Sequence, residues 1–299
     1  MGRGFTQEHG KNYEDTHSQM ARSETWRILL ALAIQYKWQV RQWDVVAAYL
    51  NAPLTHEVYV KDGEECWRLH KALYGLKQAG HEWYNTLRNI MGKAGLQQSI
   101  GDPGVFLKRE AIIIATHGDD MAAFAPDEGT ITTTESMIGK YVELEKLGQP
   151  AKLLGMELSW GPEYVKLTQK TAIGNLAKEF EIAIAIPTRS LPLNVNDYAP
   201  QMEKEPINFE LQKKYQSLVG SLLYITRHTR PEISIHVNLL GRRTSHTSQL
   251  NLQTGIRILK YLQSSIEDGI TLKRENQGLR SQEEQEVIKA FADASYGGE

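Results

Sequence analysis

The chain has 299 residues, of which 41% are hydrophobic and 23% charged, with a net charge of −2 and a pI of about 6.5. That length can bury one large core or two smaller ones, and the acidic pI argues against a uniformly basic nucleic-acid-binding surface. No apolar run approaches the roughly 20 residues of a membrane helix, and the N-terminus lacks the apolar stretch of a signal peptide. The single cysteine excludes an intrachain disulfide. We therefore expect a cytoplasmic protein without a membrane segment.

The first third of the chain predicts a helix, a strand and a second helix. Ser23 is a favoured N-cap residue type for the first helix. The apolar face of this helix consists of Trp26, Leu29, Leu30 and Ile34. Residues 38–43 alternate in the manner of a strand that runs into Asp44. The second helix carries Trp83 on its apolar face and ends at Gly95.

The middle of the chain predicts a β-hairpin with an acidic tip. Residues 105–108 and 111–116 have the composition of strands, and residues 121–124 of another. Between the last two strands lies Gly118-Asp119-Asp120, which is typical of a tight turn.

The remainder predicts a helix over residues 130–144 and two strands over residues 153–158 and 164–168. The stretch from 187 to 206 contains four prolines and little periodicity, which indicates a linker. Beyond it we predict three helices and a closing strand, at residues 211–226, 231–243, 248–264 and 287–291. Strands and helices mix without βαβ regularity, so the predicted fold class is α+β.

Asp44, Asp119 and Asp120 are candidates for a metal site, because Mg²⁺ prefers oxygen ligands and a site for it needs carboxylates gathered at one point. Each has a simpler interpretation. Adjacent aspartates are common in solvated turns, and an aspartate after a strand also caps helices. Aromatic residues at helical spacing, such as Trp83 and Tyr84, are more often core than contact surface.

A series of motifs adds weight to the carboxylates. In chain order they are R-G-F-T-Q (3–7), Y-E-D-T-H-S-Q-M-A-R (13–22), D-V-V-A-A-Y-L-N (44–51), K-A-L-Y-G-L-K-Q-A (71–79), D-P-G-V-F (102–106), L-G-M-E (154–157), Y-Q-S-L-V-G-S-L-L-Y (215–224) and T-R-P-E-I (229–233). This series resembles the reverse transcriptase of copia-type (Pseudoviridae) LTR retrotransposons, a part of the Pol polyprotein. The resemblance covers nearly the whole chain.

The resemblance implies a right-hand polymerase. Residues 1–186 correspond to an N-terminally incomplete fingers, the palm and the start of the thumb, 187–206 to a linker, 207–284 to thumb or connection helices, and 285–299 to the start of an RNase H-like domain. It also implies a primed RNA or DNA template, deoxynucleotide triphosphates and other parts of the Pol polyprotein as partners, and a location in cytoplasmic particles.

The same resemblance assigns roles to individual residues. Asp44, Asp119 and Asp120 are the catalytic carboxylates, holding two Mg²⁺ ions, with Mn²⁺ as an alternative. The nucleotide side comprises Arg3, Tyr49, Tyr74, Gly75 and Lys77. Leu154 and Gly155 fall in the turn that grips the primer, and Asp293 is the first carboxylate of the RNase H remnant.

The chain departs from the family pattern near the carboxylates. His117 and Gly118 replace a tyrosine and a valine before the aspartate pair, and we expect Gly118 to loosen the turn. Further departures are Gly80-His81, His17 and Gln19. The alternative to an active reverse transcriptase is therefore an inactive retrotransposon remnant that at most binds nucleic acid. A third reading, an unrelated metal-dependent hydrolase, conflicts with the ordered motifs.

Overall fold

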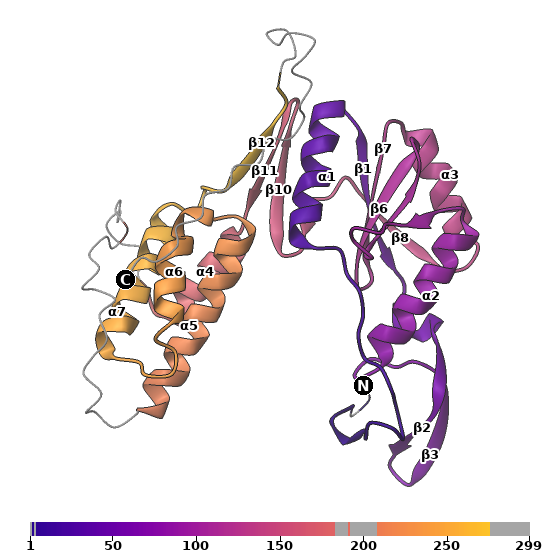
Figure 1. Cartoon of the computed structure of the whole chain (residues 1–299), viewed down its shortest axis with the longest axis horizontal. Helices are drawn as coiled ribbons and strands as arrows, with labels where there is room; N and C mark the ends of the chain where they lie inside the picture. The colour runs from indigo at the N-terminus through magenta and orange to yellow at the C-terminus, as the bar shows by residue number, and fades with distance from the viewer. Residues whose placement is uncertain (1, 3, 183–190, 192–207, 276–299) are drawn as a thin grey trace.

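The computed structural model describes residues 2, 4–182, 191 and 208–275, and shows a mixed α and β architecture (Figure 1). A six-stranded sheet with its helices lies at one end, a group of helices at the other, and a second sheet between them. Arg3, Asp293, the predicted strand 287–291 and all of the predicted linker except Leu191 lie outside the described residues.

The central sheet is antiparallel, in the order β4-β5-β6-β7-β1-β8. Its strands are β4 (Gln97–Gln98), β5 (Val105–Lys108), β6 (Ile112–His117), β7 (Asp120–Ala125), β1 (Gln39–Val45) and β8 (Leu144–Gly148). The predicted strand into Asp44 and the predicted acidic hairpin are confirmed. Alternate residues of β1 and β7 enter two different cores, so the sheet separates two apolar layers.

Helix α1 (Ser23–Tyr36) covers one face of this sheet, and α2 (Ala79–Lys93) and α3 (Glu128–Ile138) cover the other. The core on the α1 side also takes side chains from a second sheet, in the order β12-β11-β10-β9. Its strands are β9 (Lys152–Leu153), β10 (Met156–Gly161), β11 (Tyr164–Thr168) and β12 (Ile270–Lys273). Helix α1 is thus packed between two sheets.

The start of α1 differs from the prediction that Ser23 is its N-cap. The N-cap is Arg22, with no side-chain cap, and Asp102 from a distant turn holds the start of the helix through the Arg22 amide and the Thr25 hydroxyl. One carboxylate oxygen of Asp102 accepts hydrogen bonds from the Arg22 amide at 2.9 Å and the Thr25 hydroxyl at 2.5 Å, and the other accepts one from the Gly104 amide at 3.1 Å. The D-P-G-V-F motif therefore fixes the beginning of α1.

We expect Asp102→Ala to lower the free energy of unfolding by about 2–3 kcal/mol, because one buried and two partly buried hydrogen bonds lose a charged acceptor. Urea denaturation measures the change. Asp127→Ala is the matched control, since Asp127 caps α3 through a solvent-exposed hydrogen bond to the Thr130 amide and its loss should cost only about 1 kcal/mol. Equal losses in the two variants would contradict this role for Asp102.

The helix predicted over residues 130–144 is too long at its C-terminal end. Helix α3 ends at Ile138, and Leu144 begins β8, which pairs with β1. The pairing of β8 places Glu145 opposite Asp44. Strand β12, which pairs with β11, was not predicted at all. Both errors concern strands that depend on partners far away in the sequence.

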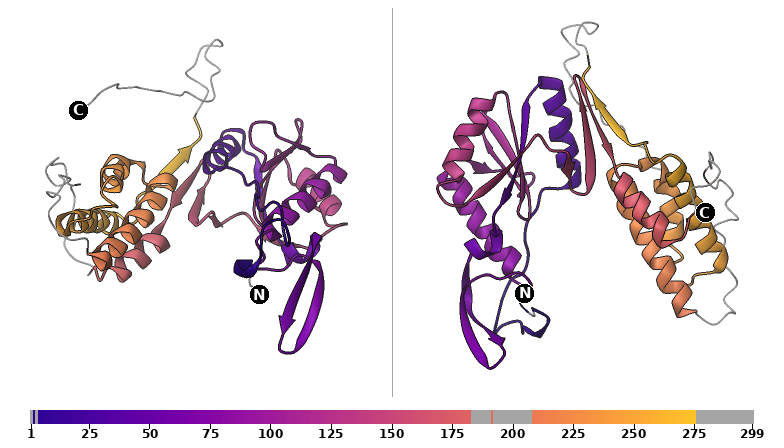
Figure 2. Two further views of the ribbon diagram at one scale, coloured as in Figure 1. Left: turned by 60° about the horizontal axis from the view of Figure 1, so that its bottom comes forward. Right: turned by 180° about the vertical axis from the view of Figure 1, so that it is seen from behind.

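Strands β2 (Pro53–Asp62) and β3 (Glu65–Lys71) form a separate two-stranded hairpin. Figure 2 shows it projecting away from the central sheet in both views. Val58 at its base is buried in the core that contains α2, whereas Tyr59 and Trp67 further out are more than half exposed. The short 3₁₀ helix η2 (Ala48–Asn51) connects β1 to this hairpin.

The helices at the other end share a core of their own. They are α4 (Lys170–Glu179), α5 (Phe209–His228), α6 (Ser234–Gly241), α7 (Gln249–Ser264) and the 3₁₀ helix η4 (Pro231–Ile233). The last three predicted helices are confirmed, and Ser248 caps α7 in a capping box with Asn251. We call α4–α7 the helical unit.

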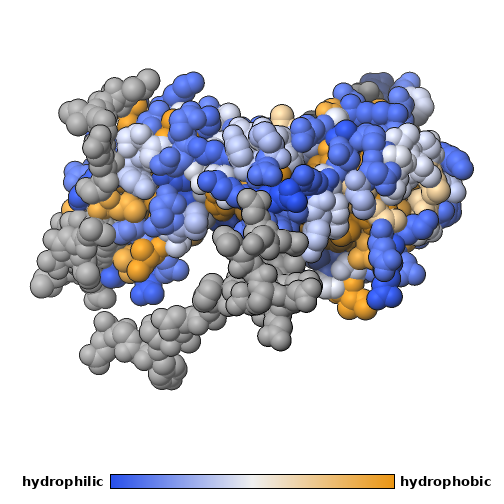
Figure 3. All heavy atoms as spheres, turned by 90° about the horizontal axis from the view of Figure 1, so that it is seen from above, coloured by the Kyte–Doolittle hydropathy of each residue, from blue (hydrophilic) through white to orange (hydrophobic). Residues whose placement is uncertain are grey.

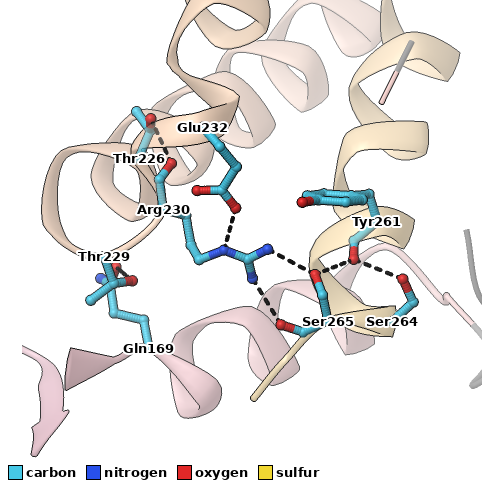
Figure 4. A network of polar contacts seen from close by, with 8 residues as sticks. All are labelled: Gln169, Thr226, Thr229, Arg230, Glu232, Tyr261, Ser264 and Ser265. Carbon is cyan, nitrogen blue, oxygen red and sulfur yellow. Dashed lines mark hydrogen bonds and ion pairs between the residues drawn. The ribbon is translucent and has the colours of Figure 1, made fainter. Parts of the chain in front are cut away.

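Arg230 of the T-R-P-E-I motif is buried just after the end of α5 (Figure 4). Its guanidinium donates to Glu232 at 2.6 Å and to the Ser265 carbonyl and hydroxyl at 2.9 and 2.7 Å. It also lies over the Tyr261 ring. These contacts tie the end of α5 to the end of α7, so the motif has a structural role here.

Within the described residues, no helix combines the length and apolar character needed to span a bilayer. Seen from above, hydrophilic side chains cover most of the visible surface, with hydrophobic residues interspersed (Figure 3).

Candidate active site

Strands β6 and β7 meet in a two-residue turn at the predicted acidic tip. His117 ends β6 and pairs with Asp120, which begins β7, leaving Gly118 and Asp119 as the turn. Gly118 has φ +69°, and Asp119 is not among the residues with positive φ. Glycine at the first position is what a type II′ turn requires. The glycine that we expected to loosen the turn is therefore the residue type that its backbone favours. We call β6, this turn and β7 the carboxylate hairpin.

The sheet brings the three predicted aspartates together. Asp44 of β1 is the direct cross-strand partner of Asp120, and Asp119 lies in the adjoining turn. Because side chains alternate along a strand, Asp44 and Asp120 share a face of the sheet with Val40 and Phe124, the face that α1 covers. Helix α1 begins only at Ser23. The aspartates lie at the end of the sheet that is close to this N-terminus of α1.

Electrostatic repulsion acts among these groups. Burial raises the pKa of Asp44, and the charges of Asp119, Asp120 and Glu145 raise it further. Gln42, also on the α1-covered face, donates a hydrogen bond of 3.3 Å to Asp120. Within the described residues no lysine or arginine forms an ion pair with the three aspartates. Such uncompensated negative charge is what a divalent cation would neutralise.

We expect Asp44→Asn to stabilise the metal-free chain at neutral pH. A raised pKa means that the folded chain binds the Asp44 proton more tightly than the unfolded chain does. Stability is then lost as pH rises from the ordinary aspartate pKa through the raised value. Urea unfolding in EDTA should show the variant more stable at pH 7, with the difference shrinking towards pH 3, about one unit below the ordinary pKa. A variant whose relative stability does not change with pH would contradict this account.

The backbone of the turn is held from the opposite side of the sheet. The indole Nε1 of Trp83, on α2, donates a 2.9 Å hydrogen bond to the Gly118 carbonyl. Trp83 is 1% exposed and belongs to the core between α2 and the sheet. The prediction that Trp83 is a core residue is confirmed, and its polar atom contacts the carboxylate hairpin.

The predicted nucleotide-side residues divide into two groups. The rings of Tyr49 and Tyr74 lie with centroids 4.5 Å apart. Burial raises the pKa of both hydroxyls, and the negative charge of Asp119 raises it further. Lys77 is engaged elsewhere, because its ammonium donates to the Gln7 carbonyl at 3.1 Å.

Gly75 adopts φ +96°, and a Cβ there would lie 2.3 Å from the Gly2 carbonyl oxygen. Its own carbonyl accepts a 3.0 Å hydrogen bond from the Gly4 amide. Gly75 thus lets the N-terminal segment approach the loop before α2. Arg3 lies outside the described residues.

The predicted primer turn contacts the helical unit. Leu154 and Gly155 both have positive φ, at +50° and +74°. The Tyr224 hydroxyl of α5 donates to the Leu154 carbonyl at 3.0 Å and would lie 1.9 Å from a Cβ on Gly155. Gly155 is therefore required both by its backbone and by Tyr224. Leu154 and His117 line one pocket.

His117 carries the titratable ring that we expected beside the carboxylates. Desolvation lowers its pKa, although Asp120 and Asp119 act in the opposite direction, and nearby His228 lowers it further. The ring is thus largely neutral at neutral pH, which weakens it as a competitor for a carboxylate.

Four contributors to this region were missed from the sequence: Gln42, Glu145, the indole of Trp83 as a donor, and Tyr224. Gln42 had a usable signal, since it is a polar residue between Val40 and Asp44 on one face of the predicted strand. The other three depend on pairing or packing between distant segments, which periodicity does not reveal.

The carboxylates of Asp44, Asp119 and Asp120 suit a hard divalent cation, but protein side chains alone do not complete the coordination of such an ion here. Among the described residues, no three His, Cys, Asp or Glu side chains are gathered closely enough to hold an ion alone. Magnesium characteristically binds through one or two carboxylates, with water and substrate phosphates as the other ligands. Asp44, Asp119 and Asp120 are of the ligand type that such partial coordination requires.

Comparison with known proteins agrees with the motifs. Residues 1–193 match the family described as reverse transcriptase (RNA-dependent DNA polymerase). The chain is 29% identical over 315 residues to the retrovirus-related Pol polyprotein from transposon RE1 of Arabidopsis thaliana, covering 100% of this chain and 20% of that protein. It is 27% identical over 317 residues to the corresponding polyprotein from transposon TNT 1-94 of Nicotiana tabacum, covering 99% and 23%.

A more distant similarity, 25% identity over 290 residues, links it to the transposon Ty1-DR5 Gag-Pol polyprotein of Saccharomyces cerevisiae, with 90% of this chain and 16% of that protein covered. The chain thus spans about a fifth of the length of these relatives. The matched family and the nature of the relatives lead to one conclusion: the chain belongs to the reverse transcriptase family, as a copia-type retrotransposon Pol domain.

Proposed function

We propose that this chain is an RNA-directed DNA polymerase, which transfers nucleotides onto the 3′-hydroxyl of a primer. The observation that carries the proposal is the pairing of Asp44 with Asp120 across two strands, with Asp119 in the adjoining turn. Two divalent ions, Mg²⁺ or Mn²⁺, would supply activation of the attacking hydroxyl and charge neutralisation at the leaving pyrophosphate.

The chain's own residues supply position and shape. Asp44 and Asp120 would hold the ions from neighbouring strands, whose ladder fixes the spacing between them, and Asp119 would complete the set. Tyr49 and Tyr74 would form an aromatic surface for the sugar of the incoming nucleotide, with Tyr49 excluding a 2′-hydroxyl.

The other proposed contacts follow from the same arrangement. Arg3, Gly75 and Lys77 would support the triphosphate side, Lys77 by holding the segment around Gln7 in place. Leu154 and Gly155 would contact the primer strand, since they lie between the carboxylate hairpin and α5.

The domain assignment is proposed in the same terms. The central sheet with α1–α3 would form the palm, the β2–β3 hairpin part of the fingers, and the helical unit the thumb or connection, with Asp293 in an RNase H-like segment. A primed template, deoxynucleotide triphosphates and other Pol segments would be the partners, as expected for a domain that matches one fifth of the longer relatives.

A second candidate, an inactive remnant that binds nucleic acid, is favoured by two observations. His117 and Gly118 replace the residues of the family pattern, and the three carboxylates do not form a ready cage within the described residues. Both candidates belong to the same family, but only the first catalyses nucleotide transfer.

Primer extension on poly(rA)–oligo(dT) with dTTP and Mg²⁺ or Mn²⁺ tests the proposal. We expect extension that requires both the template and the divalent ion, and that is absent from an Asp119→Ala, Asp120→Ala double variant. Folded wild-type protein that gives no extension would support the remnant. Phosphate release without template dependence would instead indicate a hydrolase.

A further inference from the structure

The connection between α6 and α7 combines basic and hydroxyl side chains. It spans residues 242–248, with the sequence R-R-T-S-H-T-S, and contains the only adjacent arginines of the chain, Arg242 and Arg243. Because α7 runs from this connection towards β12, the connection lies at the end of the helical unit away from the second sheet (Figure 1). None of its residues belongs to the aspartate site or to the predicted nucleotide and primer contacts.

The four hydroxyl side chains of this connection differ in what they contact. Those of Thr244 and Thr247 donate to backbone carbonyls at 3.0 and 3.1 Å. Ser248 is buried and caps α7. Ser245 is exposed, and within the described residues its hydroxyl has one polar neighbour, the exposed His246 ring at 3.2 Å. Ser245 therefore carries the hydroxyl that is most accessible to an approaching enzyme.

The backbone around Ser245 is anchored to α5. The side-chain amide of Gln212 donates to the carbonyls of Thr244 and Ser245, both at 3.0 Å, and that of Gln216 donates to the Thr244 carbonyl at 3.0 Å. Arg242 is exposed, and its guanidinium forms no ion pair with any described residue. An accessible serine and an accessible arginine are thus presented together at the surface.

We propose that Ser245 is a phosphorylation site for a protein kinase that selects arginines before its acceptor serine. Arg242 and Arg243 stand three and two positions before Ser245, where carboxylates of such a kinase can bind them. Ser245 Oγ forms a bond to the γ-phosphorus of ATP as the bond from that phosphorus to the β–γ bridging oxygen breaks. ADP leaves, and the hydroxyl proton passes to the catalytic aspartate of the kinase.

The modification would change the charge of this surface. A serine phosphate carries about −1.5 to −2 charges at pH 7, which would nearly cancel those of Arg242 and Arg243. The exposed guanidinium of Arg242 would be available to pair with the phosphate oxygens. The inference concerns a site outside the aspartates and does not depend on the proposed polymerase function.

The test is incubation of the full chain with Mg-ATP and the catalytic subunit of cyclic-AMP-dependent protein kinase, a kinase that selects arginine pairs. Tandem mass spectrometry then maps the modified position. We expect a single phosphate, on Ser245, and none in Ser245→Ala. Arg242→Gln should lower the initial rate of phosphorylation about tenfold, because it removes a charge-assisted contact with the kinase.

Two control variants match these substitutions. Arg88→Gln removes the same charge from an exposed position on α2 and should leave the rate unchanged. Ser217 is also exposed and follows Lys214 by three positions, but it lies within α5 and its hydroxyl donates to Glu179 at 3.4 Å. Phosphorylation should therefore persist in Ser217→Ala. Thermal unfolding verifies that each variant is folded.

Three results would overturn the proposal. Phosphate that persists in folded Ser245→Ala would place the acceptor elsewhere. Equal slowing by Arg242→Gln and Arg88→Gln would show that the kinase does not recognise the arginine pair. An unmodified full chain would also contradict the proposal, and ready phosphorylation of a peptide of residues 239–250 alongside it would show that the fold withholds the serine.

Discussion

Replacing Asp120 by asparagine is expected to reduce primer extension by about 10³-fold, because the loss of an ionic metal ligand removes several kcal/mol of transition-state stabilisation. Asparagine keeps the size of the side chain and its place opposite Asp44, so the ladder between β1 and β7 should remain. Single-turnover extension at saturating duplex measures the change in the chemical step.

Glu145→Gln provides the matched control for this experiment. Glu145 is also a cross-strand neighbour of Asp44, but on the β8 side and exposed. Removing its charge should leave the extension rate within about threefold, while still relieving some repulsion on Asp44. If Asp120→Asn retained wild-type activity, or if both variants lost it equally, the assignment of Asp120 as a metal ligand would be wrong.

Trp83→Phe should slow extension by about 100-fold, since a displacement of about 1 Å in a catalytic group has an effect of that size. The variant keeps an aromatic ring in the core but removes the hydrogen bond from Nε1 to the Gly118 carbonyl. We therefore expect Trp83 to act as a positioning residue for the carboxylate hairpin. The loss should fall on kcat, with the KM for the deoxynucleotide little changed.

Trp26→Phe offers a close comparison. Trp26 is also fully buried, on the other side of the same sheet, and its Nε1 has no hydrogen-bond partner within the described residues. Both substitutions should lower thermal stability through lost packing, Trp83→Phe the more because it also loses a hydrogen bond, but only Trp83→Phe should lower kcat. A parallel loss of activity in the two variants would show that Trp83 matters only through packing.

The site was predictable from the sequence as far as local patterns extend. Alternating residues before Asp44 and a glycine-aspartate turn between two apolar runs each specify a strand or a hairpin within about ten residues. These predictions were confirmed by β1, β6 and β7. That the hairpin pairs with β1, so that Asp120 faces Asp44, came only from the resemblance and from the structure.

Two predicted helix boundaries failed for different reasons. Ser23 has the right side chain for an N-cap, but Asp102 satisfies the start of α1 from 80 positions away in the sequence. Residues 139–144 begin with Gly139, the C-cap of α3, so a local stop signal after Ile138 was overlooked, and the following segment forms β8, which pairs with β1. Tertiary contact therefore decides the start of α1, whereas a local signal marks the end of α3.

The pairing of β12 with β11 has a mechanical consequence. Strand β11 leads into α4, and β12 follows α7, so both tethers of the helical unit are neighbouring strands of one ribbon. Two adjacent strands joined by backbone hydrogen bonds bend more readily out of the plane of their ribbon than they twist or shift within that plane. Movement of α5 relative to the carboxylate hairpin must therefore bend that ribbon. The stiffness of the β11–β12 pairing would then limit how far α5 can move from the carboxylate hairpin.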